Sequence, residues 1–496
     1  MIDALPEKGV ASDQILAELR ELRGADLPTH GGRLFAYVYD PALEGLDDLT
    51  RAAHAGSAHV NGLDPTAFPS LLAMENALVG AAAKLLGGTP ETVGSVTSGG
   101  TESLILAVKA ARDAYPAISE PRLVIPATAH AAFAKAAHYL RVALDVVPVE
   151  GLRADPRAMA AAITPDTVLV AASAPSYAHG VVDPVAEIAA IAAERGVRFH
   201  VDACFGGWIL PYLRRLGADL PDFDLSVPGV TSISVDLHKY AYAPKGVSIL
   251  LHRDQALRLP QYFAYADWPG YPMINPGIAS TRSGGPIAAA FATLRGIGDA
   301  GYLELARKTR ESVAVLAAAV TATDGVRLYA PAETSVVCLA ADTAAVTETV
   351  ASDTAASDTA DTASASASGG VDLFVLADEL AARGWHTQLQ MAYAGLPPTI
   401  HLTVTAAVHA TAPAFAADLA DAVAATRAKG PVELPPLPPL TPETITPALI
   451  ASLAEGLGLR GGDFTRMAAV NSVLNAAPPA LREALLTGFL SLLQRP

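Results

Sequence analysis

Cysteine, basic charge and long apolar runs are all scarce in this chain of 496 residues. Its two cysteines, Cys204 and Cys338, cannot build a disulfide framework or a multi-cysteine zinc site, which favours a reducing compartment. Lys and Arg number 34 against 50 Asp and Glu, a formal charge of −16, so the basic surface of a nucleic-acid binder is not expected. No apolar run reaches the roughly 18 residues that span a bilayer, and the first ten residues lack a signal-peptide pattern. We therefore expect an acidic, cytoplasmic protein without a membrane span.

Several catalytic motifs are absent too. The sequence has no GK[ST] phosphate loop, no HExxH or other close spacing of histidines, and no GxSxG nucleophile elbow. No metal site is predicted, and serine hydrolysis has no support. What is abundant is apolar residues, at 51% against 17% charged residues, which is enough to bury a large core in more than one domain.

Short β-branched runs alternate with helical patterns between residues 93 and 251. This alternation predicts an α/β fold with a mainly parallel sheet covered on both faces. Ligand sites in such sheets lie beyond the carboxyl ends of the strands. The predicted strands are 93–97, 123–126, 142–147, 168–173, 197–201, 232–235 and 248–251, and the predicted helices between them are 101–115, 131–140, 156–163 and 185–195.

The pattern changes beyond about residue 300, where a long helix over 302–323 precedes a mixture of strands and helices typical of a smaller α+β domain. Residues 343–369 consist almost entirely of Thr, Ala, Ser, Asp and Gly, a composition that predicts a disordered insertion. The predicted organisation is an N-terminal helical segment (1–55), a large domain (56–300), a small domain (301–430), a proline-rich linker (431–447) and a helical tail (448–496).

A lysine and an aspartate follow predicted strands. Lys239 comes soon after the strand that ends at Val235, and a partly desolvated amine beside His238 could be unprotonated at neutral pH and form a Schiff base. Asp202 follows the predicted strand 197–201. A carboxylate among such apolar neighbours needs a cation or a hydrogen-bond donor as a partner. It could cap a helix or form a local salt bridge, or it could keep a pyridinium nitrogen protonated.

Two further positions suit an anion and a flat ring. In SVTSGGTES a strand ends, Gly99 and Gly100 allow close backbone approach, and Thr101 opens a helix whose free amides could hold a phosphate. The same residues would also suit an ordinary strand–helix turn. His130, between a strand and a helix, could stack on an aromatic ring and steer protons, or it could cap the helix.

The order of these four features, and the local sequences around them, resemble one family. TSGGTES, AHAAFAKAA, HGVVDPV, HVDACFGG, TSISVDLHKYAYAPKG and STRSGG are similar to the sphingosine-1-phosphate lyases, within the pyridoxal-phosphate decarboxylases of fold-type I. The resemblance runs from about Arg33 to Ala428 and implies a seven-stranded, mainly parallel sheet and pyridoxal 5′-phosphate as the cofactor. It also implies a homodimer in which the loop Ser280–Gly285, with Arg282 and Gly284, completes the partner's site.

The resemblance assigns roles by matching position. It implies Lys239 as the Schiff-base lysine, Asp202 as the partner of the pyridine nitrogen and His130 as the stacking residue. The cofactor-binding residues that it implies are Gly99, Gly100, Thr101, His130, Asp202, His238, Lys239 and Gly284. It implies Tyr37 or Tyr39 as the active-site tyrosine and Asn61, Asp64, Lys245 and Arg282 as substrate contacts.

Asp64 departs from the family pattern. This chain reads Asn61-Gly-Leu-Asp64-Pro where the lyases have N-P-L-H-P, with a histidine that helps to receive the substrate phosphate. A nearby carboxylate would repel a phosphate by about 1–4 kcal/mol. This predicts a substrate other than a phosphorylated sphingoid base.

The residues leave the reaction open between two bond cleavages. A carbon–carbon lyase would break Cα–Cβ of a β-hydroxy amine, possibly phosphorylated, to give an aldehyde and an amine, whereas an amino-acid decarboxylase would release carbon dioxide. A tyrosine or Lys239 could then protonate Cα. A non-catalytic scaffold is the third interpretation, and the presence of all four cofactor features disfavours it.

Overall fold

The computed structural model describes residues 5–342, 370–434, 440–457, 459 and 466–494. The predicted disordered insertion at 343–369 lies outside the described residues, as do 435–439 of the proline-rich linker. Within the described residues, no helix combines the length and the apolar character that crossing a bilayer requires.

A seven-stranded sheet forms the larger body, in the order β1-β9-β8-β7-β6-β2-β3. β9 runs antiparallel to β1 and β8, and all other neighbours pair in parallel. The carboxyl ends of β1, β7 and β8 therefore meet at one edge of the sheet. The strands are β1 (Val93–Thr97), β2 (Arg122–Pro126), β3 (Ala143–Val147), β6 (Thr167–Ser173), β7 (Arg198–Asp202), β8 (Ser232–Asp236) and β9 (Ser248–His252).

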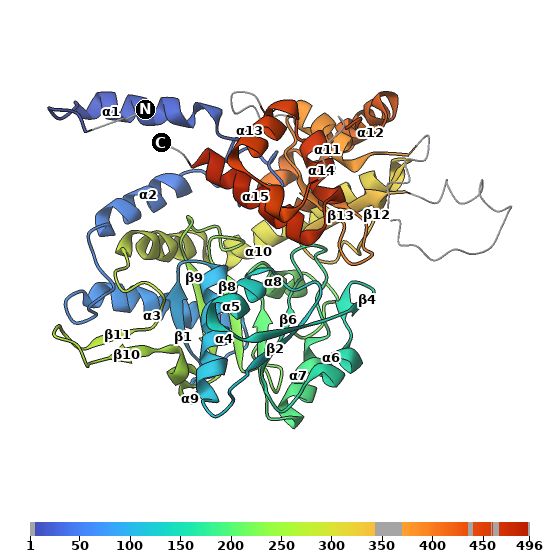
Figure 1. Cartoon of the computed structure of the whole chain (residues 1–496). Coiled ribbons are helices and arrows are strands. Elements are labelled where there is room, and N and C mark those ends of the chain that lie inside the picture. The colour runs from blue at the N-terminus through green and yellow to red at the C-terminus, as the bar shows by residue number, and fades with distance from the viewer. Residues whose placement is uncertain (1–4, 343–369, 435–439, 458, 460–465, 495–496) are drawn as a thin grey trace.

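Helices cover this sheet on both faces, as the alternating sequence pattern predicts (Figure 1). Every residue of β6, β8 and β9 is buried, which agrees with the mainly apolar sequences of β6 and β9. The helices packed around the sheet are α3 (Pro69–Leu85), α4 (Gly100–Ala114), α5 (Ala132–Leu140), α6 (Pro156–Ala162), α7 (Val185–Glu194), α8 (Leu210–Arg215) and α9 (Gln255–Arg258), with α2 (Leu46–Ser57) packed on α10.

Two helical segments that meet at a break at Gly298, together labelled α10 (Gly284–Ala322), link the two bodies of the molecule. The sequence predicted only 302–323, so the prediction missed its first half. Gly298 adopts a left-handed φ of 68° inside the helix and kinks it, and this break hides the continuity from the sequence pattern. The helix crosses the predicted domain boundary at residue 300.

A second sheet, entirely antiparallel and of four strands, follows α10 in the order β12-β13-β15-β14. It has a separate apolar core built around Trp385, Leu339 and Phe415. Its elements are β12 (Val326–Leu328), β13 (Val336–Ala341), α11 (Leu373–Ala382), β14 (Gln388–Gln390), β15 (Thr399–Thr403) and α12 (Ala412–Lys429).

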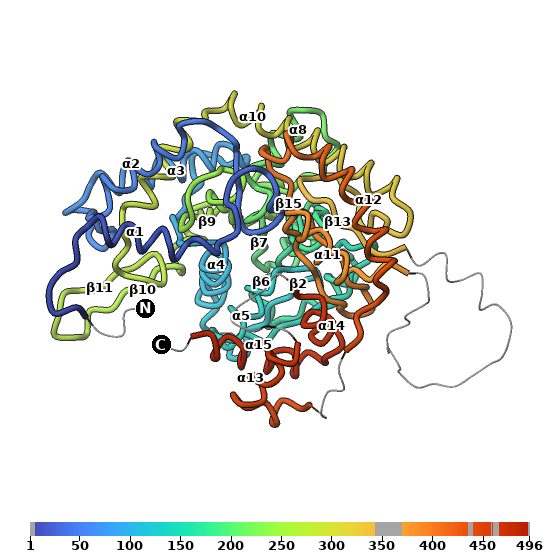
Figure 2. The backbone as a smooth tube through the Cα atoms, turned by 90° about the horizontal axis from the view of Figure 1, so that it is seen from above, coloured from blue at the N-terminus to red at the C-terminus, as the bar shows by residue number. Residues whose placement is uncertain are grey.

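The two ends of the chain lie outside both sheets (Figure 2). The tail forms α13 (Pro447–Gly456), α14 (Ala468–Ala476) and α15 (Pro479–Leu493). It is fixed to the second body by Asp378 of α11, whose carboxylate accepts from the amides of Met467 and Ala468 at the start of α14. At the other end, α1 (Ser12–Leu22) buries no residue at all. A hairpin of β10 (Phe263–Tyr265) and β11 (Met273–Asn275) projects on the same side as α1 in both views.

Candidate active site

Lys239 lies at the carboxyl edge of the large sheet and forms an ion pair with Asp236. Its Nζ is 3.1 Å from Asp236 Oδ2, and the aspartate is only 2% exposed. Burial alone would lower the pKa of Lys239, but the carboxylates of Asp236 and Asp202 outweigh burial and raise it. The expectation of a neutral amine was therefore wrong, because Asp236, the last residue of β8, holds the lysine as an ammonium ion.

Asp202 ends the neighbouring strand β7, also almost fully buried at 7% exposed. Its Oδ1 accepts from the amide of Cys204 at 3.1 Å. Its charge contributes to the raised pKa of Lys239, so the two groups face one site. The structure thus brings together the lysine and the aspartate that the sequence singled out, as the parallel pairing of β7 and β8 requires.

The turn between β1 and α4 lies against Asp236 and Cys204. A Cβ at Gly100 would come within 2.9 Å of both Asp236 Oδ2 and Cys204 Sγ, so only glycine fits there. Gly99, at the N-cap, offers no side chain to cap α4. Glu102 accepts from the amide and hydroxyl of Ser98, while Thr101 is exposed. The positive end of α4 is therefore open to an anion.

Two histidines lie near these groups: His238 directly precedes the lysine, and His130 contacts Tyr177. His130 Nδ1 accepts from the amide of Ala132 at 3.1 Å, which leaves Nε2 as the donor toward solvent, and its ring meets Tyr177 edge-on at 6.3 Å. His238 Nδ1 is 2.9 Å from the carbonyl of Val247, and its Nε2 is 3.5 Å from Asp236. The helix-cap interpretation of His130 is thus realised in the structure, and the cap fixes the orientation of its ring.

Tyr39 lies in an aromatic group beside the lysine, whereas Tyr37 is 65% exposed. Tyr39 packs edge-on against Tyr240 at 5.2 Å and against Phe205 at 6.3 Å. Its pKa is raised by burial, then by Tyr177 and Asp236. Lys239 Nζ lies 5.7 Å from the ring of Phe205, so Tyr39 and Lys239 share this aromatic wall.

Two residues of strand β15, Thr403 and His401, contact the tyrosines Tyr39 and Tyr177. The Tyr39 phenol is hydrogen bonded to Thr403, and Thr403 Oγ1 is 2.7 Å from His401 Nε2. His401 Nδ1 is 3.3 Å from the carbonyl of Ala178, so Nδ1 is the donor and Nε2 the acceptor. The same imidazole stacks on Tyr177 at 4.7 Å. The second sheet therefore orients side chains of the site in the first.

Lys245 is the second cation of the site. Its Nζ donates to the carbonyl of His238 at 3.2 Å and lies 4.9 Å from the centre of the Tyr39 ring. Desolvation and the charge of Lys239 lower its pKa to about 8. This ammonium thus interacts with Lys239, and among the described residues it forms no salt bridge with a carboxylate.

The remaining predicted residues form a separate group at the start of α10. Asn61 Oδ1 accepts from the amides of Leu63 and Arg282, and the Arg282 guanidinium is 2.5 Å from Glu75. Gly284 donates its amide to Val60, and Asp64 is an exposed turn cap whose Oδ1 accepts from the residues that follow it. Within one chain, Arg282 therefore contacts Asn61 and Glu75, and Gly284 contacts Val60.

Asp236, Tyr177 and His401 are the residues that the sequence reasoning missed. Asp236 stands three residues before Lys239, a spacing that could have suggested an ion pair after a strand. Tyr177 and His401 are 224 positions apart, and no local pattern connects them.

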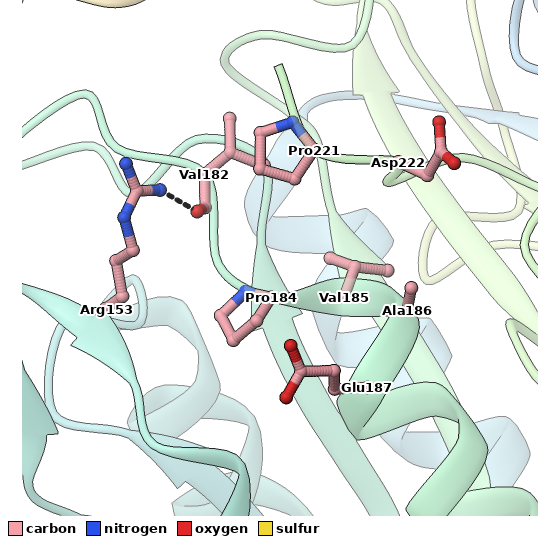
Figure 3. Close-up of a pocket in the computed structure, with 8 residues that line it drawn as sticks. All are labelled: Arg153, Val182, Pro184, Val185, Ala186, Glu187, Pro221 and Asp222. Atoms are coloured by element: carbon pink, nitrogen blue, oxygen red, sulfur yellow. Dashed lines mark hydrogen bonds between the residues drawn. The ribbon is translucent and has the colours of Figure 1, made fainter. Parts of the chain in front are cut away.

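A surface hollow around the start of α7 is not part of this group (Figure 3). Arg153 donates to the carbonyl of Val182 there and forms an ion pair with Glu333 at 2.6 Å. None of the residues predicted to carry chemistry lines it. Its lining is Arg153, Val182, Pro184, Val185, Ala186, Glu187, Pro221 and Asp222.

The residues at the sheet edge fit pyridoxal phosphate on three counts. Lys239 can bind the aldehyde of the cofactor, and the buried carboxylate of Asp202 suits its pyridine nitrogen. The start of α4 at Gly99, which has no side-chain cap, suits its phosphate. Among the described residues, no cluster of His, Cys, Asp or Glu could hold a metal ion.

Two family models match the chain. The pyridoxal-dependent decarboxylase conserved domain covers residues 4–341, and a putative C-terminal HTH domain of pyridoxal-dependent enzymes covers 417–492. The fold is shared with the glutamate decarboxylase of Lactobacillus brevis, which is 19% identical with a TM-score of 0.71 over 86% of this chain and 95% of that one.

Closer relatives are sphingosine-1-phosphate lyases. That of Dictyostelium discoideum is 34% identical over 84% of this chain and 74% of its own length, and that of Arabidopsis thaliana is 33% identical over 87% and 75%. The structure of the Burkholderia pseudomallei sphingosine-1-phosphate lyase has a TM-score of 0.77 at 32% identity, covering 86% of this chain and 94% of that one. The chain therefore belongs to the pyridoxal-dependent decarboxylase family of fold-type I, within it to the group of the sphingosine-1-phosphate lyases, and it is a pyridoxal-phosphate-dependent lyase.

Proposed function

We propose that the enzyme cleaves the Cα–Cβ bond of a phosphorylated β-hydroxy amine and releases an aldehyde and a phosphorylated amine. The observation that carries this proposal is the meeting of Lys239, Asp202 and the start of α4 at one sheet edge, with the cation of Lys245 beside them. The relatives that are named sphingosine-1-phosphate lyases support it, because a substrate of that name is a phosphorylated amino alcohol.

The bound cofactor would supply an electron sink for the bond that breaks. In the proposed assignment, Lys239 would hold its aldehyde carbon, Asp202 would pair with its ring nitrogen, and His130 would lie against its ring. Gly99, Gly100, Thr101 and His238 would receive its phosphate, at the open end of α4.

Two proton movements then need groups of this chain. A base must take the proton of the β-hydroxyl, and an acid must protonate Cα after the aldehyde leaves. Tyr39 and Tyr177 both have a raised pKa and stay phenols at neutral pH, so they suit the second task. Lys239 is the other candidate donor at Cα, because Asp236 keeps it protonated when it is a free amine. The exposed Tyr37, which interacts with Tyr177, remains an alternative to Tyr39 as the proton donor.

The head group of the substrate is assigned to Lys245. Its ammonium lies beside Lys239 and would attract a phosphate dianion. The opposing expectation came from Asp64, but that carboxylate is fully exposed and already accepts from Thr66 and Ala67. Solvent and these donors weaken its repulsion, so the expectation of a substrate other than a phosphorylated sphingoid base is given up.

The functional unit is proposed to be a cytoplasmic homodimer in which the Ser280–Gly285 loop completes the partner's site. The apolar side chains of α1 need a cover, since Ile15, Leu16, Leu19 and Leu22 are between 43% and 73% exposed. The hairpin of β10 and β11, on the same side, exposes Phe263, Tyr265 and Ile274. Two buried free cysteines suit the reducing cytoplasm.

Product analysis separates this reaction from amino-acid decarboxylation, which the matched family model keeps as the second candidate. With purified enzyme, pyridoxal phosphate and a long-chain phosphorylated β-hydroxy amine, we expect equal amounts of aldehyde and phosphorylated amine and no carbon dioxide. The unphosphorylated amine should react much more slowly. Release of carbon dioxide from an amino acid, with no aldehyde from the phosphorylated amine, would contradict the proposal.

A further inference from the structure

Asp236 is the end of a buried chain of hydroxyl groups that begins at the proposed phosphate turn. Ser248 Oγ donates to Asp236 Oδ1 at 2.6 Å, and Ser103 Oγ lies 3.1 Å from Ser248 Oγ. Thr97 Oγ1 is 2.7 Å from Ser103 Oγ. These groups come from β8, β9, α4 and β1, and each residue is at most 2% exposed.

The sheet order creates this chain. In the register of the two ladders, Ser248 of the antiparallel strand β9 pairs with Thr97 of β1 on one side and with Asp236 of β8 on the other. Ser248 has a single proton, and its contact with Asp236 at 2.6 Å is shorter than its contact with the carbonyl of Val235 at 3.1 Å. With that proton on Asp236, Ser248 accepts from Ser103, which accepts in turn from Thr97. All donors thus point toward Asp236, and such a chain strengthens each bond in it.

The other oxygen of Asp236 faces the cations. Oδ2 is 3.1 Å from Lys239 Nζ and 3.5 Å from His238 Nε2. A Cβ at Gly100 would also meet this carboxylate, so Asp236 contacts the start of α4. One buried carboxylate therefore touches three residues that are assigned to the cofactor: the lysine, the histidine and the glycine.

We propose that Asp236 is the positioning residue of the cofactor site: it sets the charge and direction of the Lys239 nitrogen, and the hydroxyl chain fixes Asp236 relative to the phosphate turn. The inference rests on the proposed role of Lys239 and adds a second carboxylate to the one assigned to the pyridine ring. Asp236 touches the amine end of the cofactor site, whereas Asp202 serves the ring.

The other charged or titratable groups that face Lys239 come from three segments. Asp202 and Cys204 face it from β7 and the turn that follows, His238 and Lys245 from its own loop, and Tyr177 from the loop after β6. Cys204 keeps a raised pKa because of burial and then because of Asp202 and Asp236, so it is an uncharged thiol at neutral pH. Asp236 is the carboxylate in direct contact with the amine.

The test is a pH titration of the visible absorbance of full-length protein loaded with pyridoxal phosphate. Asp236→Asn removes the charge, Ser248→Ala removes one donor to it, and Asp224→Asn is the control, a buried carboxylate that accepts a serine hydroxyl away from the lysine. A carboxylate beside the lysine nitrogen keeps that nitrogen protonated to higher pH. We expect Asp236→Asn to lower the midpoint by about one pH unit or more, Ser248→Ala to lower it less, and Asp224→Asn to leave it unchanged.

The variant Lys239→Ala distinguishes a failure of the proposed function from a failure of the proposed role of Asp236. If this variant keeps the visible absorbance, the assignment of Lys239 fails, and the proposed function fails with it. If it loses the absorbance while Asp236→Asn and Ser248→Ala both keep the wild-type midpoint, the role of Asp236 is refuted. Should Asp236→Asn not fold, as judged by circular dichroism, the midpoint of Ser248→Ala alone decides: a lower value supports the proposal and an unchanged or higher value overturns it.

Discussion

Gly100→Ala tests the geometry of the phosphate turn, with Gly99→Ala as its matched control. The new methyl group at position 100 would lie 2.9 Å from Asp236 Oδ2 and from Cys204 Sγ, well inside van der Waals contact. At position 99 the nearest atom, His238 Cε1, is 3.7 Å away, an ordinary contact, and the φ of 168° is open to any residue. Two adjacent glycines thus differ sharply in the space around them.

The magnitude follows from overpacking in a site where both opposing side chains are held. Forcing a methyl group into such a contact costs about 1–3 kcal/mol, partly offset by the gain of up to about 1 kcal/mol for alanine over glycine in a helix. Relief requires the start of α4 to move away from Asp236, which would spoil the anion site. We expect lower stability to heat and an affinity for pyridoxal phosphate weaker by about tenfold, since tenfold corresponds to about 1.4 kcal/mol.

Thermal unfolding of the cofactor-free proteins and fluorescence titration with pyridoxal phosphate measure both effects. Gly99→Ala should keep wild-type stability. If Gly100→Ala were as stable and as tight in binding as the wild type, the close packing of α4 on Asp236 would be refuted.

Three other predictions concern the surroundings of the lysine. Thr403→Val removes the hydrogen-bond partner of Tyr39 and should lower kcat by about fivefold, as expected for one lost hydrogen bond near 1 kcal/mol, with cofactor affinity unchanged; an unchanged kcat would speak against a role of the Tyr39–Thr403 hydrogen bond in catalysis. Because the pKa of Lys245 is lowered to about 8, its charge is present below that pH and lost above it, so KM for a phosphorylated substrate should rise as pH passes 8. Lys245→Arg should postpone that rise, and a pH-independent KM would exclude Lys245 as the phosphate contact. Leu19→Glu should shift the protein toward monomer in light scattering, whereas Leu490→Glu, an equally exposed leucine of α15, should not; equal behaviour of the two would refute α1 as part of the interface.

The sequence predicted the scaffold of the site well. The strand 93–97 was predicted with the bounds that β1 has, and the strands before Asp202 and Lys239 ended within a residue of the prediction. Continuous apolar runs reveal buried parallel strands, and parallel strands bring their ends to one edge. Lys239 and Asp202 could therefore be expected to meet before any coordinates were considered.

The contacts between distant segments could not be predicted in the same way. The pairing of Asp236 with Ser248 depends on β9 entering the sheet antiparallel between β1 and β8, and no local pattern specifies that order. The state of Lys239 depends on this neighbour, which is why the prediction of a neutral amine was wrong. The stacking of His401 on Tyr177 likewise joins two sheets that the sequence treats as separate domains.

The most direct test of the account is to locate the bond between the chain and its cofactor. Protein loaded with pyridoxal phosphate is reduced with borohydride, digested and mapped by mass spectrometry. The account predicts one phosphopyridoxyl group per chain, on Lys239. Modification of Lys245 or of another lysine in place of Lys239, or no modified peptide at all, would contradict it.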